Sequence, residues 1–582
     1  MSVTLFKEVG YSLSGLLEDI EMGEIGLPEM QRPFVWPNAK VRDLFDSMYR
    51  GFPIGSLLFW VNGFSEVHHQ IGADKKQKTP RLLIVDGQQR LTSLYAVLRG
   101  KEVVRKDYSK ERIRIAFMPK AGRFEVTDAA IKRDPEFIPD ISQLWSAGGS
   151  RKSFLKGFVT RLRKHREVTD AEEDALWDAI DQLYELQNYP FTVLELSANM
   201  PEEEVSHVFV RINSTGTQLN QADFILTLMS VFWDEGRTQL ESFCRAARQP
   251  GPGSPYNHFI QPDPDQLLRV TVALGFRRAR LQHVYSLLRG KNLETEEFSE
   301  AMRDKQFATL RDAQAYTLDL QSWHDFLKVL LRAGFRSSDM IASQVGLLYN
   351  YALFLIGKRD YGVDDYALRN LIARWFFISS LTRRYTTSPE TAMEQDLAHL
   401  REVKDASGFV EVLDRIMEDS LPDDYWAITL PNELATSAPR SPALLAYYAA
   451  LNLLDANVLF SKVKVGELLD PAFKSKRAAI ERHHLFPKGY LAKQGITAVR
   501  DTNQIANFAL VEWGDNADIG DKAPAEYLPG YTERLTEAEL ARMYYWHALP
   551  ISWEGMDYDA LLATRRRLLA QVIKDGFATL KG

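Results

Sequence analysis

Short apolar runs alternate with amphipathic stretches over residues 1 to about 235, a pattern that indicates mixed α/β architecture. Four apolar side chains recur at helical spacing between residues 41 and 48, and Asn38 is the predicted N-cap of that helix. Two largely apolar runs, 55–61 and 81–85, predict strands, and the second leads directly into an Asp-Gly turn.

Segments rich in Pro, Gly and Ser interrupt the rest of the chain at 249–255 and 436–442. They divide it into three predicted domains, 1–235, 256–435 and 443–582. The middle domain has the pattern of a series of amphipathic helices with few strand signals. The last domain ends in a helix whose polar face is predicted to carry Arg565, Arg566 and Arg567.

The composition is that of a soluble globular protein, since 45% of the 582 residues are hydrophobic and 26% are charged. No uncharged apolar run approaches the ~20 residues that span a bilayer, and no basic segment before an apolar stretch marks a secretory signal. A cytoplasmic protein without membrane contact is therefore expected. Cys244 is the single cysteine, which excludes an intramolecular disulfide and a thiolate zinc cluster. The formal net charge of -7 excludes a histone-like protein, but it does not exclude local contact with phosphate.

Two adjacent histidines, His483 and His484, stand out because the chain has 11 histidines in all. Neighbours on a strand point to opposite faces, so the two rings are expected to do different work. They begin the pattern His-His-x-x-Pro, which Asn507 and Asn516 follow in the chain. Taken alone, the pair is more simply a surface feature beside ordinary loop asparagines.

Taken in this order, the residues resemble the HNH, or His-Me finger, nucleases, in which a β-hairpin and a helix hold one divalent metal ion. The resemblance implies that His484 is the general base, which takes a proton from the attacking water. It places His483 and Asn516 at metal-ligand positions, and it gives Asn507 the task of holding the loop of the base in place. The expected fold of residues 443–582 is a ββα-metal nuclease domain within a helical surround.

The chemistry of phosphodiester hydrolysis suits these residue types. In-line attack by water needs a base with a pKa near neutrality, which imidazole supplies, and a cation to neutralise the scissile phosphate. Mg²⁺ is the expected metal, with Mn²⁺ or Ni²⁺ as alternatives because His483 stands where relatives often carry Asp. A local basic cluster, which is ordinarily only a solvated face, is the candidate DNA contact: Lys474, Lys476, Arg477 and Arg482.

Three further signals lie in the first block, at residues 31–36, 86–90 and 209–216. The middle one, Asp-Gly-Gln-Gln-Arg, joins a predicted strand to a predicted helix, and such a junction presents backbone N–H groups to an anion. Arginines in all three segments could add charge-assisted contacts to phosphate oxygens. On its own, the Asp-Gly junction is more simply a tight turn with a satisfied aspartate.

Together the three signals resemble the ParB/sulfiredoxin-like DGQQR domain, found at the front of GmrSD-type modification-dependent restriction enzymes and of phosphorothioate-sensing defence nucleases. The resemblance implies sensing of modified DNA and hydrolysis of a nucleoside triphosphate, GTP or ATP, with Asp86 as a catalytic residue. The aromatic side chains of Phe34, Trp36 and Trp60 either belong to the core or stack on a base. The implied nucleotide-binding residues are Gly87, Gln88, Gln89, Arg90, Arg32, Arg211 and Asn213.

The leading hypothesis is a multidomain α+β antiphage endonuclease that cleaves modified foreign double-stranded DNA, with a modified base or a phosphorothioate backbone, under control of a nucleoside triphosphate. A non-catalytic or nucleotide-switched DNA-binding regulator with a decayed nuclease site is the alternative. A sulfiredoxin-like oxidoreductase is a third hypothesis, but it needs a reactive cysteine, and Cys244 lies outside every motif. The modification recognised, the preferred nucleotide and the oligomeric state, including a homodimer, are left open.

Overall fold

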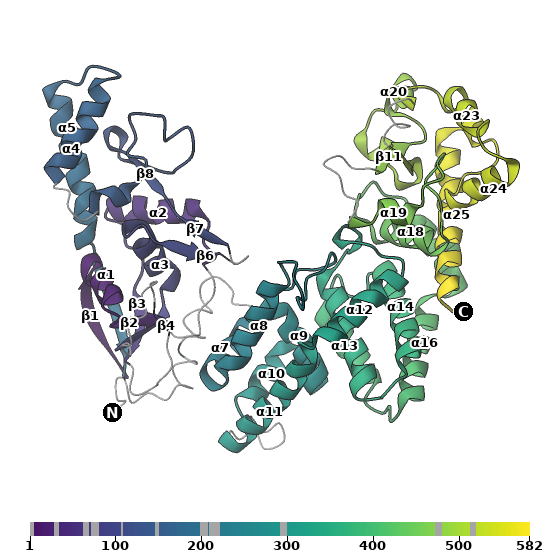
Figure 1. Cartoon of the computed structure of the whole chain (residues 1–582), viewed down its shortest axis with the longest axis horizontal. Coiled ribbons are helices and arrows are strands. Elements are labelled where there is room, and N and C mark those ends of the chain that lie inside the picture. Colours follow the sequence, from purple (N-terminus) through teal and green to yellow (C-terminus); the bar gives the residue numbers. More distant parts are fainter. Residues whose placement is uncertain are drawn as a thin grey trace. The chain divides into compact units, whose positions relative to one another are not determined.

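The computed structural model describes residues 5–27, 34–61, 69–70, 81–105, 109–145, 151–197, 208, 221–291, 299–471, 480–512 and 519–581. The chain forms two compact units, Met1–Arg237 and Thr238–Gly582 (Figure 1). The second unit includes both of the domains predicted at 256–435 and 443–582.

The first unit is built on a mixed six-stranded sheet. The strands lie in the order β1 (Phe6–Ser12), β10 (Pro190–Leu196), β3 (Leu57–Val61), β5 (Leu82–Asp86), β2 (Ile25–Leu27) and β4 (His69–Gln70). β10 runs parallel to β3, whereas β1 is antiparallel to β10 and β5 is antiparallel to β3. Two separate antiparallel hairpins pair β6 (Glu102–Val104) with β7 (Lys110–Arg112), and β8 (Ile115–Met118) with β9 (Arg123–Val126).

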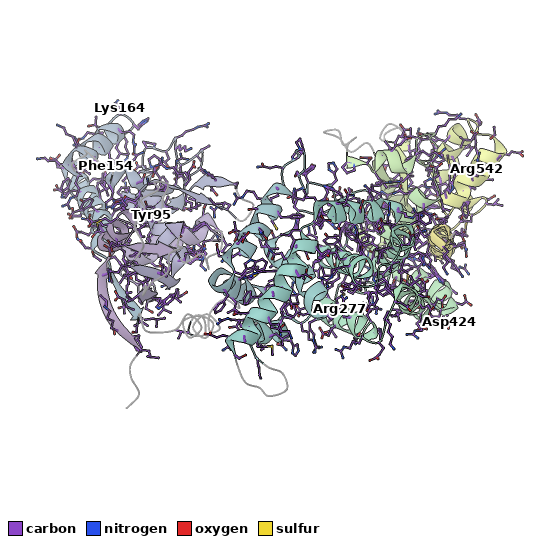
Figure 2. All side chains as sticks on the ribbon, turned by 60° about the horizontal axis from the view of Figure 1, so that its bottom comes forward. Tyr95, Phe154, Lys164, Arg277, Asp424 and Arg542 are labelled. Atoms are coloured by element: carbon purple, nitrogen blue, oxygen red, sulfur yellow. The ribbon has the colours of Figure 1, made fainter. Side chains whose placement is uncertain are left out.

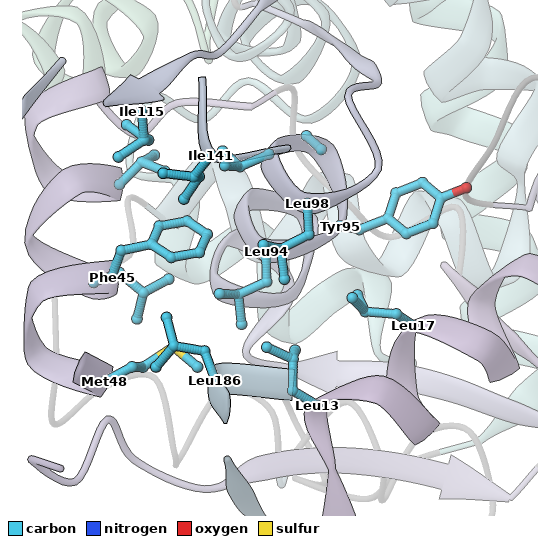
Figure 3. Close-up of a cluster of buried hydrophobic side chains, with 14 of the residues drawn as sticks. Leu13, Leu17, Phe45, Met48, Leu94, Tyr95, Leu98, Ile115, Ile141 and Leu186 are labelled. Atoms are coloured by element: carbon cyan, nitrogen blue, oxygen red, sulfur yellow. The ribbon is translucent and has the colours of Figure 1, made fainter. Parts of the chain in front are cut away.

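Helices pack on one face of this sheet and form the main core of the unit. They are α1 (Leu13–Glu21), α2 (Asn38–Tyr49), α3 (Gln88–Leu98), α4 (Arg151–Arg163) and α5 (Asp170–Tyr184). α7 (Gln221–Phe232) follows β10 in the chain, and none of its described residues belongs to this core. Lys164 marks the tip of the hairpin that α4 and α5 form (Figure 2). The core joins Phe59 of β3 to side chains of α1, α2 and α3, and Figure 3 shows some of its helical members, such as Phe45 and Leu94. Alternate strand residues, such as Trp60, form a smaller cluster on the other face of the sheet.

The prediction that Asn38 is an N-cap is wrong. α2 begins at Asn38 itself, and the preceding Pro37 is the N-cap residue in an extended conformation. The Asn38 side chain instead accepts a hydrogen bond from Arg105 and donates one to Glu111 Oε1, 2.7 Å away. Because both partners lie far along the chain, the local sequence pattern could not reveal them.

Helices make up most of the second unit. Its first part contains α8 (Asp234–Ala246), α9 (Pro264–Phe276), α10 (Leu281–Leu288), α11 (Glu300–Thr317), α12 (Leu320–Arg332), α13 (Gln344–Arg359), α14 (Asp365–Leu381), α15 (Pro389–His399), α16 (Ala406–Ser420), α17 (Leu430–Glu433) and α18 (Pro442–Leu453). α13 is buried along nearly its whole length, because apolar or small residues occupy its faces. A π-helical turn, Tyr425–Thr429, follows Asp424, which Figure 2 labels. Among the described helices, none combines the length and the apolar character that crossing a bilayer requires.

The C-terminal part of the second unit carries a two-stranded antiparallel ribbon, β11 (Ile480–His484) and β12 (Phe508–Glu512). The helices around it are α19 (Val465–Leu468), α20 (Lys488–Lys493), α21 (Val499–Thr502), α23 (Pro524–Thr532), α24 (Glu537–Trp546) and α25 (Tyr558–Ala578), with a short 3₁₀ turn at Ile505–Asn507. α25 packs closely along α18, since a Cβ on Gly576 would lie 2.5 Å from Ala450 Cβ.

The predicted mixed α+β composition is confirmed, with a small mixed sheet in the first unit and helices through most of the rest. The strands predicted at 55–61 and 81–85 are present as β3 and β5. The finer assignments, a ParB/sulfiredoxin-like domain and a ββα-metal nuclease domain, stay predictions.

The prediction that Arg565 lies on a polar helix face is wrong. Its side chain is fully buried, and its guanidinium donates hydrogen bonds to the backbone carbonyls of His547 and Ala506. Burial lowers the pKa of Arg565 to about 10, and the neighbouring Tyr447 opposes this shift, so the group stays charged at neutral pH. Carbonyl dipoles compensate the buried charge, and these partners lie on other elements that helical periodicity cannot show.

His547 is fully buried and gives the second unit a dependence on pH. Its Nε2 lies 2.9 Å from the carbonyl oxygen of Asn457, and desolvation lowers its pKa from 6.5 to about 4. Between these pH values the unfolded chain binds a proton that the folded chain does not bind. Folding stability is therefore lost as the pH falls from 6.5 to 4, and the part due to His547 reaches about 3 kcal/mol at pH 4.

We expect His547→Gln, which can keep a donor toward Asn457, to flatten the pH dependence of the urea unfolding midpoint over this range. The matched control is His399→Gln at the exposed end of α15, which should leave the curve of the wild-type protein unchanged. Parallel curves for His547→Gln and the wild-type protein would contradict this origin of the pH dependence.

Candidate functional site

The first candidate site lies where the β11–β12 ribbon ends. His483 pairs with Ala509, and His484 pairs with Phe508. Because successive side chains on a strand point to opposite faces, the two imidazoles have different surroundings. His483 is buried, with its ring edge-on to Tyr527 at 5.7 Å between centroids, whereas His484 is half-buried.

Two contacts hold His484. Its Nε2 lies 3.0 Å from Asn503 Oδ1, and its ring packs against Phe508 with the centroids 4.5 Å apart. Desolvation lowers the pKa of His484 below its ordinary value and the charge of Lys488 adds to this, while the hydrogen bond with Asn503 opposes it. The imidazole is therefore neutral at pH 7, the form that can accept a proton. Asn503 is not among the site residues predicted from the sequence, although it lies four residues before Asn507.

Asn507 ties the loop after His484 to the turn before β12. Its Oδ1 accepts a hydrogen bond from the Phe486 N–H at 2.9 Å, and its Nδ2 donates to the carbonyls of Phe486 and Thr502 at 3.1 and 3.0 Å. The side chain is fully buried, so its amide satisfies backbone groups that water cannot reach. This geometry makes Asn507 a positioning residue rather than a group that meets a substrate.

Of the two predicted metal ligands, His483 is described, whereas Asn516 lies outside the described residues. In the part of the chain that the structure describes, no cluster of three His, Cys, Asp or Glu side chains could hold a metal ion. A single imidazole donor suits Mn²⁺ or Ni²⁺ better than Mg²⁺, which prefers oxygen ligands. The predicted DNA contacts also lie outside the described residues. They are Lys474, Lys476, Arg477 and the side chain of Arg482.

The second candidate site is the junction between β5 and α3. Gly87 separates the two elements with a φ of +94°, in the left-handed region. A Cβ on Gly87 would lie 2.2 Å from Leu57 Cδ2, so the turn requires glycine both for its conformation and for space. The half-buried Asp86 ends the strand, and α3 starts two residues later at Gln88. The strand–turn–helix junction predicted from the sequence is therefore present.

Arg90 stabilises this junction through hydrogen bonds. Its guanidinium donates hydrogen bonds to the carbonyls of Ile54 at 2.6 Å and Ser56 at 2.8 Å, and its Nη2 lies 3.4 Å from Asp86 Oδ2. A Cβ on Gly55 would lie 2.7 Å from Arg90 Nη1, so glycine there lets the guanidinium approach the backbone. With these donors engaged, Arg90 positions the loop before β3, and its direct contact with a nucleotide stays a prediction.

Gln89 connects the motif at residues 86–90 to the motif at residues 31–36, because its Oε1 accepts a hydrogen bond from the Val35 N–H at 3.0 Å. Of the aromatic candidates, Phe34 and Trp60 are buried in the core. Trp36 is half-buried, with the Lys40 ammonium 4.4 Å from its ring centroid. The predicted site residues Arg32, Arg211 and Asn213 lie outside the described residues.

Cys244 is buried in α8, and desolvation raises the pKa of its thiol. A buried thiol with a raised pKa contains little thiolate, which is the reactive form. The oxidoreductase hypothesis, which needs a reactive cysteine, therefore finds no support in Cys244.

Replacing Asn507 by Ala should destabilise the protein, because the N–H and the carbonyl of Phe486 lose their partner in the interior. Each buried unsatisfied group costs about 1–3 kcal/mol, so a loss of roughly 3 kcal/mol or more is expected. Urea unfolding followed by circular dichroism measures the loss. Asn432→Ala, at an exposed position of α17, should change stability by less than about 0.5 kcal/mol. Equal midpoints for the two variants would show that Asn507 does not hold the loop.

Comparison with known proteins finds a family match over most of the first unit. Residues 13–230 match the family described as GmrSD restriction endonuclease, N-terminal domain. An uncharacterized protein of Methanocaldococcus jannaschii is 22% identical over 568 residues, which span 90% of this chain and 87% of the relative. The resemblance predicted from the N-terminal motifs is thus confirmed, whereas the HNH assignment of the C-terminal part stays a prediction. Over residues 13–230, this chain is therefore similar to the N-terminal domains of GmrSD restriction endonucleases.

Proposed function

We propose that this protein is a DNA endonuclease that hydrolyses modified foreign DNA with the aid of a divalent metal ion, under control of a nucleoside triphosphate. One observation carries the proposal: a chain with a GmrSD restriction endonuclease N-terminal domain also holds a neutral imidazole, that of His484, fixed at the end of a two-stranded ribbon. A neutral, oriented imidazole is the group that hydrolysis of a phosphodiester needs as its base.

In the proposed reaction, His484 takes a proton from a water molecule whose oxygen attacks the phosphorus atom. The new P–O bond forms as the bond to the leaving nucleoside oxygen breaks, and that oxygen takes a proton from solvent. Asn507 supports the step by keeping the loop after His484 in one position. A divalent cation, when bound by His483 and Asn516, would neutralise charge on the scissile phosphate and the leaving oxygen.

A nuclease that contacts mainly phosphates reads little sequence, so a separate element has to protect the chromosome of the host. We assign this role to the N-terminal domain. The start of α3 after Gly87 suits the phosphates of a nucleotide, because backbone N–H groups at a helix N-terminus attract anions. The half-buried ring of Trp36 is a candidate contact for a modified base, and a phosphorothioate backbone is the other substrate class.

His484→Ala should lower the rate of metal-dependent plasmid cleavage by about 10²–10⁴, the usual range for loss of a general base, while DNA binding stays near normal. The matched control is His399→Ala, an exposed histidine at the end of α15, which should cut at the wild-type rate. Wild-type cleavage by His484→Ala would refute the assignment of the base. A wild-type protein that binds plasmid and never nicks it would instead favour the DNA-binding regulator.

Asp86→Ala should reduce hydrolysis of GTP or ATP by at least about 100-fold, because the carboxylate at the end of β5 is the proposed catalytic group. Phosphate release by the full-length protein measures this rate. Asp174→Ala, at an exposed position of α5, serves as the control and should leave the rate unchanged. Undiminished turnover in Asp86→Ala would place nucleotide hydrolysis at another site.

A further inference from the structure

We infer that Asn503 fixes the tautomer and the orientation of His484, so that Nδ1 is the atom that takes the proton of the attacking water. The inference rests on the proposed function, in which His484 is the general base. It starts from one contact, the 3.0 Å approach of His484 Nε2 to Asn503 Oδ1. Asn503 acts through His484 and is therefore a positioning residue.

The chemistry of this contact determines which ring nitrogen carries the proton. An amide oxygen is only an acceptor, so the ring nitrogen that faces it has to be the protonated one. In a neutral imidazole the other nitrogen then carries the lone pair. Within the described residues, Nδ1 of His484 makes no hydrogen bond, so its lone pair is available to a water molecule.

Asn503 can serve this purpose because the backbone around it is held from several sides. Asn503 follows the last residue of α21, and its own N–H donates to the carbonyl of Val499 at 3.0 Å. The carbonyl of the preceding Thr502 accepts a hydrogen bond from Asn507 Nδ2 at 3.0 Å and lies 3.5 Å from Tyr558 Oη. The backbone that carries Asn503 is therefore anchored both to the 3₁₀ turn before β12 and to α25.

Phe508 limits the remaining freedom of the imidazole. The two rings are tilted by 52° with their centroids 4.5 Å apart. The hydrogen bond holds one edge of the His484 ring while the tilted Phe508 ring packs against it, so exchange of the two nitrogens by rotation is hindered. A side chain at position 503 without an acceptor would remove the hydrogen bond and leave only the ring contact.

Two substitutions separate the hydrogen bond from the shape of the side chain. Asn503→Leu keeps a similar volume and removes the acceptor, whereas Asn503→Asp keeps an acceptor oxygen. We expect Asn503→Leu to lower kcat for plasmid cleavage roughly 10- to 100-fold, the range for loss of a group that orients a histidine, with KM nearly unchanged. Asn503→Asp should recover most of this loss. Unchanged kcat in Asn503→Leu, or equal losses in both variants, would overturn the inference.

A second measurement reads the tautomer without any cleavage. In the full-length protein labelled with ¹⁵N-histidine, comparison of NMR spectra with and without His484→Ala identifies the signals of His484. The wild-type protein should carry the proton on Nε2, and Asn503→Leu should shift the ring toward a mixture of tautomers. A proton on Nδ1 in the wild-type protein would overturn the inference. Cleavage that survives in His484→Ala overturns the proposed function instead, so the two failures are distinguishable.

Discussion

The buried amide of Asn507 is the interaction on which the geometry of the C-terminal site depends. From the turn before β12, it joins the backbone of Phe486, just after β11, to that of Thr502 at the end of α21. His484 lies two residues before Phe486, and Asn503 directly follows Thr502, so these hydrogen bonds hold both partners of the His484–Asn503 contact. Without the amide, backbone groups in the interior would have no partner, which is unfavourable enough to rearrange the loop. The position of His484 therefore depends on the hydrogen bonds that Asn507 makes to buried backbone groups.

Both candidate sites use side-chain donors that bind backbone carbonyls distant in sequence. Arg565 of α25 donates a hydrogen bond to the carbonyl of Ala506, next to Asn507, and so supports the same turn. Arg90 reaches the carbonyls before β3 from α3, and so fixes the loop beside the Asp-Gly turn. A guanidinium suits this task because its several N–H groups in one plane can satisfy two carbonyls at once. In each site the chemical groups are held by a framework that the local sequence does not specify.

Hydrophobic periodicity predicts the central strands of the first unit and the helix after Gly87, because these elements depend on residues close together in the chain. The Asp-Gly turn is predictable for the same reason, since the conformation and the space at Gly87 require glycine. The contacts of Asn38, Arg90 and Arg565 are not predictable in this way, because their partners lie tens of residues away. Nor does a single sequence distinguish Asn503, which contacts a histidine, from an ordinary loop asparagine. The GmrSD-type domain could be predicted because three short motifs occur together, although each motif alone is weak.

The central claim is that one chain couples a phosphodiester hydrolase to a domain that admits only modified DNA. The most direct measurement digests one phage genome, prepared with and without its DNA modification, with the full-length protein. Salt, metal and nucleotide are held fixed, because contacts with phosphate weaken strongly as salt rises. Cleavage of the modified genome, with the unmodified genome left intact, is the expected result. Equal digestion of both genomes would contradict control by modification.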